Sequence, residues 1–265
     1  MPGASTSRPQ PLIWTQPPPP GRQRALGREE IVRAAIQVAD EGGAEALTMA
    51  AVARRLGPYT PMALYRYVFS KDGLVDLMLD AATAEVVLPP RPSGDWRADL
   101  WAQATSTWNM VKRHGWYAQL FHTRPPAGPH MLRHTEFALA VLTGEGVQIG
   151  EAMLFAALID RHVFGSGLQE AEERRMRTRY GLDSVEKFLA AMAPVRELAA
   201  ADGGNPNLAG WLAQPAISTP DEQFELGLAC LLDGIELRLK GDARVGPTGP
   251  GGPARSGRRR PGRGR

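Results

Sequence analysis

A break of four residues between two helix-forming segments is the feature that most constrains this chain. Thr48 is a favourable N-cap for a helix over Met49–Leu56, and Gly57 ends that helix. The residues GPYT follow, and Pro61 suits the first turn of a second helix that reaches Val68. Two short helices joined by a tight turn with a glycine predict a helix-turn-helix, whose second helix can enter the major groove of DNA.

Helical periodicity continues on both sides of this unit. We expect a first helix over Arg28–Glu41, stopped by two glycines, and a fourth helix from Lys71 to Ala82 that is capped by Ser70. After the break LPPRPSGD the helical patterns are longer, and no convincing strand alternation appears along the chain. The sequence therefore predicts an all-α fold. It divides into a DNA-binding domain over residues 26–88 and a larger helical domain over residues 95–240.

The two ends of the chain have a different composition. Residues 1–25 are rich in proline, and residues 241–265 are nearly all glycine, proline and arginine, so we expect both segments to be disordered. The C-terminal segment carries seven arginines against Asp242, a net charge of +6 in a chain of net charge +3. Such a tail attracts nucleic acid without regard to sequence, or it serves only to keep the protein in solution.

Composition also limits where the protein works. No apolar run is long enough to span a membrane, and the proline-rich N-terminus does not have the pattern of a signal peptide. The chain has one cysteine, Cys230, which excludes an internal disulfide framework. We therefore expect a soluble cytoplasmic protein with no membrane partner.

The predicted second helix of the helix-turn-helix carries side chains suited to DNA. Arg66 can pair with a guanine edge or a phosphate, and Met62 and Ala63 can contact thymine methyl groups. Thr48 and Lys71 stand at the starts of two neighbouring helices, where the helix dipoles favour phosphate contacts.

The stretch REEIVRAAIQVADEGGAEALTMAAVARRLGPYTPMALYRYVFSKDGLVDLML resembles the N-terminal domain of the TetR family of bacterial transcriptional regulators. Its motifs VARRLG, ALYRYV and SKDGL occur in the family's order over about fifty residues. The resemblance implies that the three N-terminal helices bind double-stranded DNA, and that Thr48, Tyr65 and Lys71 touch phosphates. The turn LGPYTPMAL is one residue longer than usual, which leaves Tyr59, Thr60 and Pro61 as alternatives for the start of the recognition helix.

Some of these side chains have an alternative structural role. Tyr65 could be a core aromatic, and Tyr67 could pack against the first helix instead of reaching DNA. The complete set of candidate DNA contacts is Thr48, Tyr59, Thr60, Pro61, Met62, Ala63, Tyr65, Arg66, Tyr67 and Lys71.

The same resemblance extends loosely to the larger domain. It implies a homodimer, for which the apolar helices at residues 148–164 and 221–239 are the expected interface, and a pocket for an unknown small-molecule effector. The candidate pocket residues are aromatic or polar, although aromatics at helical spacing are usually core: Trp101, Trp108, Asn109, Trp116, Phe121, His134, Phe137, Phe155 and His162.

No pattern of catalytic or metal-binding residues is present. His130 and His134 are four residues apart, but the HExxH arrangement is absent and the five histidines are scattered. We expect no metal, no cofactor and no catalytic residue. A repressor that is released from its operator by an apolar molecule is the function that this sequence favours. The alternatives are a DNA-organising protein without an effector and an all-helical enzyme.

Overall fold

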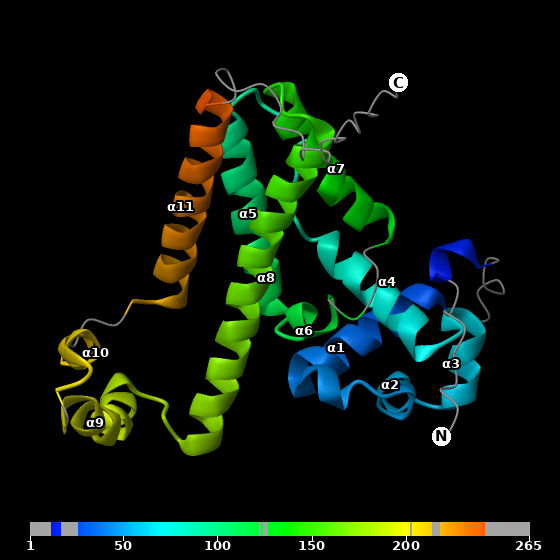
Figure 1. Cartoon of the computed structure of the whole chain (residues 1–265). Coiled ribbons are helices and arrows are strands. Elements are labelled where there is room, and N and C mark those ends of the chain that lie inside the picture. The colour runs from blue at the N-terminus through cyan, green and yellow to red at the C-terminus, as the bar shows by residue number, and fades with distance from the viewer. Residues whose placement is uncertain are drawn as a thin grey trace, which may run out of the picture.

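The computed structural model describes residues 12–16, 26–121, 123, 127–201, 203–213 and 218–241. Within these ranges the chain forms eleven α-helices and one 3-10 helix, and no β-strand (Figure 1). The predicted all-α fold is confirmed. The predicted basic tail lies outside the described residues except for Gly241, and so does most of residues 1–25.

Four helices form the N-terminal part of the molecule: α1 (Arg28–Ala46), α2 (Met49–Leu56), α3 (Pro61–Val68) and α4 (Lys71–Thr83). Thr48, Thr60 and Ser70 cap α2, α3 and α4 through their hydroxyl oxygens. The caps at Thr48 and Ser70 are the two that the sequence predicts. The helical geometry of α1 extends past Glu41 and breaks at Gly43, whose φ of 74° is outside the helical range.

The larger part of the molecule contains α5 (Trp96–Arg113), α6 (Tyr117–Phe121), α7 (Pro129–Gly144), α8 (Ile149–Tyr180) and α11 (Pro220–Gly241). Helix α8 runs through its middle and packs against α5, α7 and α11 (Figure 1). Helix α4 contacts α1 and α3 on one side and α5, α6 and α7 on the other. It therefore joins the two parts of the molecule.

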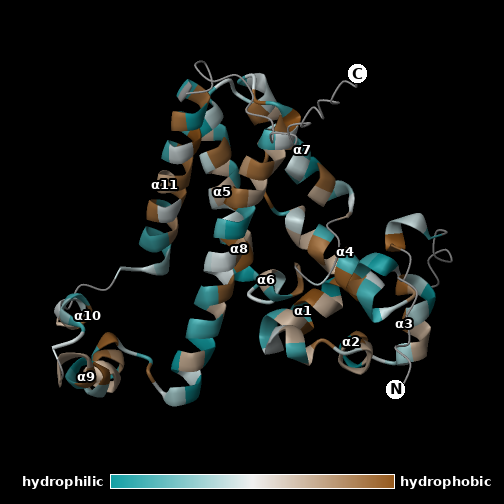
Figure 2. Cartoon of the chain, viewed as in Figure 1, coloured by the Kyte–Doolittle hydropathy of each residue, from teal (hydrophilic) through white to brown (hydrophobic). Residues whose placement is uncertain are grey.

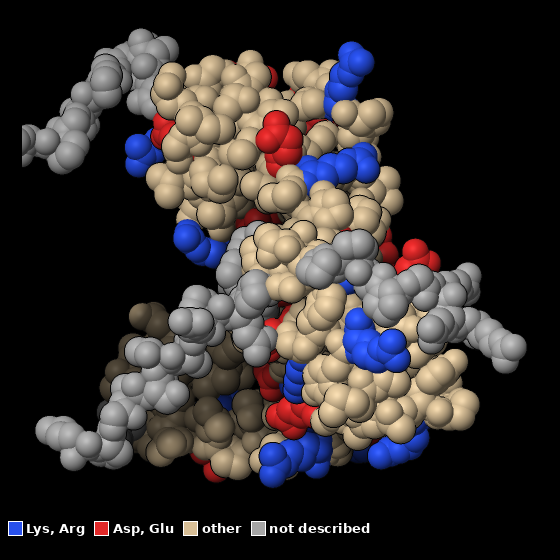
Figure 3. Space-filling model, turned by 90° about the vertical axis from the view of Figure 1, so that its right-hand side faces the viewer, with Lys and Arg blue, Asp and Glu red and all other residues tan. Residues whose placement is uncertain are grey.

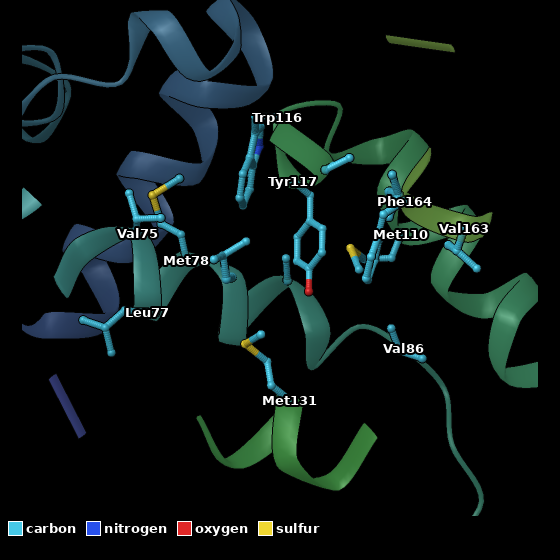
Figure 4. Close-up of a cluster of buried hydrophobic side chains, with 14 of the residues drawn as sticks. Val75, Leu77, Met78, Val86, Met110, Trp116, Tyr117, Met131, Val163 and Phe164 are labelled. Atoms are coloured by element: carbon cyan, nitrogen blue, oxygen red, sulfur yellow. The ribbon is translucent and has the colours of Figure 1, made fainter. Parts of the chain in front are cut away.

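The core between α4, α6 and α8 is built around Tyr117. Its ring lies between Trp116 and Phe164, with Met110 and Met131 nearby (Figure 4). All five side chains are at most 6% exposed. This cluster makes the two parts of the molecule one continuous hydrophobic core.

Helix α8 is longer than the sequence indicates. The sequence indicates an end near Phe164, but the whole helix is 32 residues long, because the glycines that follow Phe164 do not end it. A Cβ at Gly167 would lie 2.2 Å from a methyl group of Val111, so this glycine allows α8 to approach α5 closely. Ion pairs one turn apart, Glu170 with Arg174 and Glu173 with Arg177, support the exposed end.

One further segment departs from the expectations. Residues 12–16, predicted to be disordered, include a 3-10 helix, η1 (Ile13–Thr15), because Ile13 is buried against α4. Helices α9 (Val185–Ala201) and α10 (Pro206–Leu212) pack on each other and project from the end of α8 (Figure 1).

Candidate DNA-binding and ligand-binding sites

The turn between α2 and α3 has the geometry of a helix-turn-helix. Gly57 has a φ of 101°, a conformation that favours glycine, and it places the chain for the next helix. Thr60 Oγ1 accepts a hydrogen bond from the backbone N–H of Ala63, and Pro61 is the first helical residue. The longer turn is therefore completed by residues 57–60, and α3 begins at Pro61.

Helix α3 has one buried face and one exposed face. Leu64 and Val68 are fully buried, whereas Met62 is 74% exposed, Tyr65 is 37% exposed and Arg66 is exposed. Tyr67 differs from the expectation, because its side chain is only 5% exposed. Its ring belongs to the core below α3, so we leave it out of the proposed DNA interface.

The neighbouring candidates lie around the exposed face of α3. Lys71 and Thr48 are exposed at the starts of α4 and α2, and Tyr59 is partly buried in the turn. Thr48 Oγ1 accepts the N–H of Ala51, which leaves its hydroxyl hydrogen available to a phosphate. Figure 3 shows Lys and Arg side chains along the lower edge of the molecule, where α2 and α3 lie in Figure 1.

A cavity of about 930 Å³ opens beside α7 and α8 in the larger domain. Two much smaller cavities continue it inwards toward α5 and α4. The residues shared between the large cavity and one or both of the inner ones are Phe121, Met131, Thr135, Ala156, Asp160 and Phe164. A space of this size, lined mostly by apolar side chains with a few polar groups, suits a small organic ligand.

Two of the nine predicted pocket residues line these cavities, namely Phe121 and His134. Trp108 instead stacks on Phe224 of α11, with ring centroids 4.8 Å apart, and its indole N–H donates to Asp221. The His162 ring also stacks on the Phe224 ring, and its Nε2 donates to the carbonyl of Phe224. These side chains hold α11 against α5 and α8.

The remaining candidates also lie outside the cavity linings. Trp116 is buried and donates its indole N–H to Asp40 of α1, and Asn109 is exposed. Phe137 and Phe155 are buried in the core, and Trp101 packs at its edge. Periodicity places an aromatic on an inner face, but it does not say whether that face meets a cavity or another helix.

Residues that the sequence analysis missed supply most of the polar lining. Burial raises the pKa of the Asp160 carboxyl to about 7. Burial lowers the pKa of His134 to about 4, so its ring is neutral at pH 7, and its Nε2 lies 2.9 Å from the Thr107 hydroxyl. A lone aspartate within the apolar run of α8 was the one available signal. His130 pairs with Asp80 rather than with His134.

The helix-turn-helix has an exposed recognition face, and α4 joins it to a helical domain with a ligand-sized cavity. This combination defines a DNA-binding regulator in which one chain carries both sites. Comparisons with known proteins agree. Residues 31–78 match the model for bacterial regulatory proteins of the tetR family, and residues 88–239 match the model for the tetracyclin repressor-like C-terminal domain. The chain belongs to the TetR family of bacterial transcriptional regulators.

Individual relatives cover most of the chain. The HTH-type transcriptional repressor DrrR1 of Streptomyces coeruleorubidus is 34% identical over 85% of this chain and 84% of its own length. The tetracycline repressor protein class C of Escherichia coli is 28% identical over 81% of this chain and 93% of its own. Among solved structures, the TetR family protein ActR of Streptomyces coelicolor in complex with actinorhodin has a TM-score of 0.67 at 27% identity, and covers 83% of this chain and 99% of its own.

No helix in the described part of the chain is both long enough and apolar enough to cross a membrane.

Proposed function

We propose that this protein is a ligand-responsive repressor of the cytoplasm, which binds a near-palindromic operator as a homodimer and leaves it when an apolar small molecule enters the cavity. The observation that carries this proposal is the position of α4. It packs against the helix-turn-helix at one end, and its other end contacts α7, which lines the cavity. A ligand that changes the position of α7 therefore acts directly on the DNA-binding part.

We assign DNA contact to the candidates that are exposed or partly exposed. Arg66, Met62 and Ala63 would meet base edges from α3, while Tyr65, Lys71 and Thr48 would bind phosphates. Tyr59, Thr60 and Pro61 would lie next to the backbone at the entry to α3. Residues 26–88 act in this proposal as the DNA-binding domain, and residues 95–240 as the effector-binding and dimerisation domain.

The dimer interface is proposed on the outer faces of α8 and α11, which contain the predicted helices at residues 148–164 and 221–239. On α8 the apolar side chains of Leu154 and Leu158 are 61% and 41% exposed, and on α11 those of Leu226 and Leu237 are 68% and 72% exposed. Figure 2 shows hydrophobic segments along both helices. A pair of exposed apolar helices from each copy would bury one another in a four-helix bundle.

A dimer of this kind has to hold its two copies of α3 about 34 to 36 Å apart to reach successive major grooves. A ligand that binds the released shape better than the DNA-bound shape spoils this spacing. A hundredfold loss of operator affinity requires a preference of about 2.7 kcal/mol. The coupling is reciprocal, so operator DNA must weaken ligand binding by the same factor.

Footprinting on the DNA that flanks the protein's own gene tests the proposal. A protected two-fold site, lost when an apolar ligand is added, is the expected result. Uniform coating of DNA would instead favour the DNA-organising alternative. Ligands that occupy the cavity without any effect on operator affinity would overturn the role of the cavity as an effector site. An enzyme on this scaffold would have to turn over its ligand, and we assign no residue to catalysis.

A further inference from the structure

Among the described residues, the hydroxyl donors at the inner end of the cavity are already in use. Three threonines there each donate their hydroxyl hydrogen to a backbone carbonyl one turn earlier in their own helix, over 2.8, 2.8 and 3.1 Å: Thr83, Thr107 and Thr135. Because a hydroxyl has one hydrogen, these side chains can only accept further hydrogen bonds.

Two larger side chains have used their donors on these threonines. The Tyr117 hydroxyl lies 2.8 Å from Thr83 Oγ1, and it must be the donor because the hydrogen of Thr83 goes to a carbonyl. By the same reasoning, His134 donates its Nε2 hydrogen to Thr107. Since the ring of His134 is neutral at pH 7, its Nδ1 carries no hydrogen and is an acceptor.

Asp160 is the strongest acceptor in this region. Its carboxyl group lines the large cavity and both inner ones, so it stands where they meet. No hydrogen bond or ion pair joins it to any residue in the described part of the chain. Burial disfavours its charged form because the carboxylate loses hydration. A partner that replaces this hydration with hydrogen bonds would therefore bind well.

The charges around Asp160 make the inner end negative. Among the described residues, the basic groups on the cavity wall stand toward its outer side: Arg161 is exposed, and Arg133 donates to the carbonyl of Leu88. Glu136 is exposed at the same side. Further in, after burial itself, the charges of Asp160 and Asp80 raise the pKa of Tyr117. The described hydroxyl and imidazole groups of the inner end are thus acceptors, and an ionised Asp160 adds a negative charge beside them.

We propose that the effector is an apolar organic amine, whose ammonium group binds the Asp160 carboxylate while its hydrocarbon body fills the outer cavity. This inference rests on the proposed function, because it takes the cavity to be the effector site. An ammonium brings three donors to a region that offers acceptors. A carboxylate or a phosphate would meet the like charge of the ionised Asp160 carboxylate there. The pairing of opposite charges in a partly buried site gives a strong hydrogen bond.

A pair of fluorescent probes tests the charge requirement. 1-Pyrenemethylamine and 1-pyrenemethanol have the same apolar body and differ in the charged amine. We expect the full-length protein to bind the amine at least tenfold more tightly at pH 7.5. Asp160→Asn keeps the shape of the side chain and removes its charge, so it should abolish this advantage while the alcohol binds as before. Glu145→Gln, a matched loss of charge outside the cavity linings, should retain the advantage.

Equal affinity of the wild-type protein for the two probes, no binding of the amine, or an unchanged preference in Asp160→Asn would each overturn the inference. The comparison in the wild-type protein does not depend on how the variant folds. Operator affinity, measured with each probe, separates this inference from the proposed function. If the alcohol releases the operator as well as the amine does, the sensor function stands and the amine requirement fails. If the amine binds through Asp160 without releasing the operator, the inference stands and the sensor function fails.

Discussion

The carboxylate of Asp80 on α4 lies 2.8 Å from Nδ1 of His130 on α7. Its other oxygen accepts the backbone N–H groups of His130 and Met131, so Asp80 caps the start of α7 from a different helix. Gly128 makes room for this contact, because a Cβ there would lie 2.4 Å from the same oxygen. We therefore expect a movement of α7 caused by a ligand to reach α4 through Asp80.

Asp80→Ala should weaken this link. We expect a loss of about 1–3 kcal/mol in the free energy of unfolding, because the buried N–H of Met131 and the partly buried N–H of His130 lose their acceptor. We also expect a ligand that still binds but releases the operator less effectively. Urea unfolding and operator titrations with and without ligand measure the two effects. Glu145→Gln, at the opposite end of α7, is the control and should change neither. Normal release in a folded Asp80→Ala protein would show that the signal travels by another route.

Tyr65→Phe and Lys71→Ala should each weaken binding to operator and to unrelated DNA alike, because phosphates carry no sequence information. Loss of Lys71 should also reduce the slope of log affinity against log salt by about one. Lys187→Ala removes one charge from α9, far from α3, and is the matched control. If Tyr65→Phe or Lys71→Ala bound the operator as the wild type does, the phosphate assignment would be wrong.

Truncation after Lys240 removes a net charge of +6. We expect lower affinity for unrelated DNA and a weaker dependence on salt, while the operator footprint keeps its boundaries. Fluorescence anisotropy over a range of salt concentrations measures both. A salt slope equal to that of the full-length chain would leave the tail as a solubilising segment.

Leu158→Arg places a charge on the exposed apolar face of α8 that we assign to the dimer. The expected result is a monomer in analytical ultracentrifugation, together with loss of specific operator binding, because a buried unpaired charge costs several kcal/mol. Val87→Arg, at a residue that is 79% exposed in the connection after α4, should remain dimeric. A dimeric Leu158→Arg protein would move the interface elsewhere.

Asp160 should make stability depend on pH. Its pKa rises from 3.8 to about 7 on folding, so the folded state keeps a proton that the unfolded chain releases. The wild type should therefore lose about 1–3 kcal/mol relative to Asp160→Asn between pH 5 and pH 8. Urea unfolding at both pH values measures this difference. Glu136→Gln should show none, and parallel curves for wild type and Asp160→Asn would mean that Asp160 is solvated.

The helices that present the proposed DNA-binding face could be predicted from the sequence. The bounds of α2 follow from Thr48 and Gly57, whose effects on the backbone are local and act within one turn. Pro61, where α3 begins, was one of three alternatives for its start. The buried positions of α3 follow equally from its periodicity. Tyr67 could not be placed in this way, because its environment depends on the helices packed below it.

The cavity was decided by tertiary structure alone. Trp108 and Phe121 are both aromatic residues of the same domain, yet Trp108 packs against α11 and Phe121 faces the cavity, because the rotation of each helix against its neighbours sets what its inner face meets. The length of α8 was decided similarly, since Gly167 is tolerated inside it through close contact with Val111. Local propensity determined where helices start and stop around the turn. Packing between distant segments determined where empty space remained and which carboxylate was left facing it.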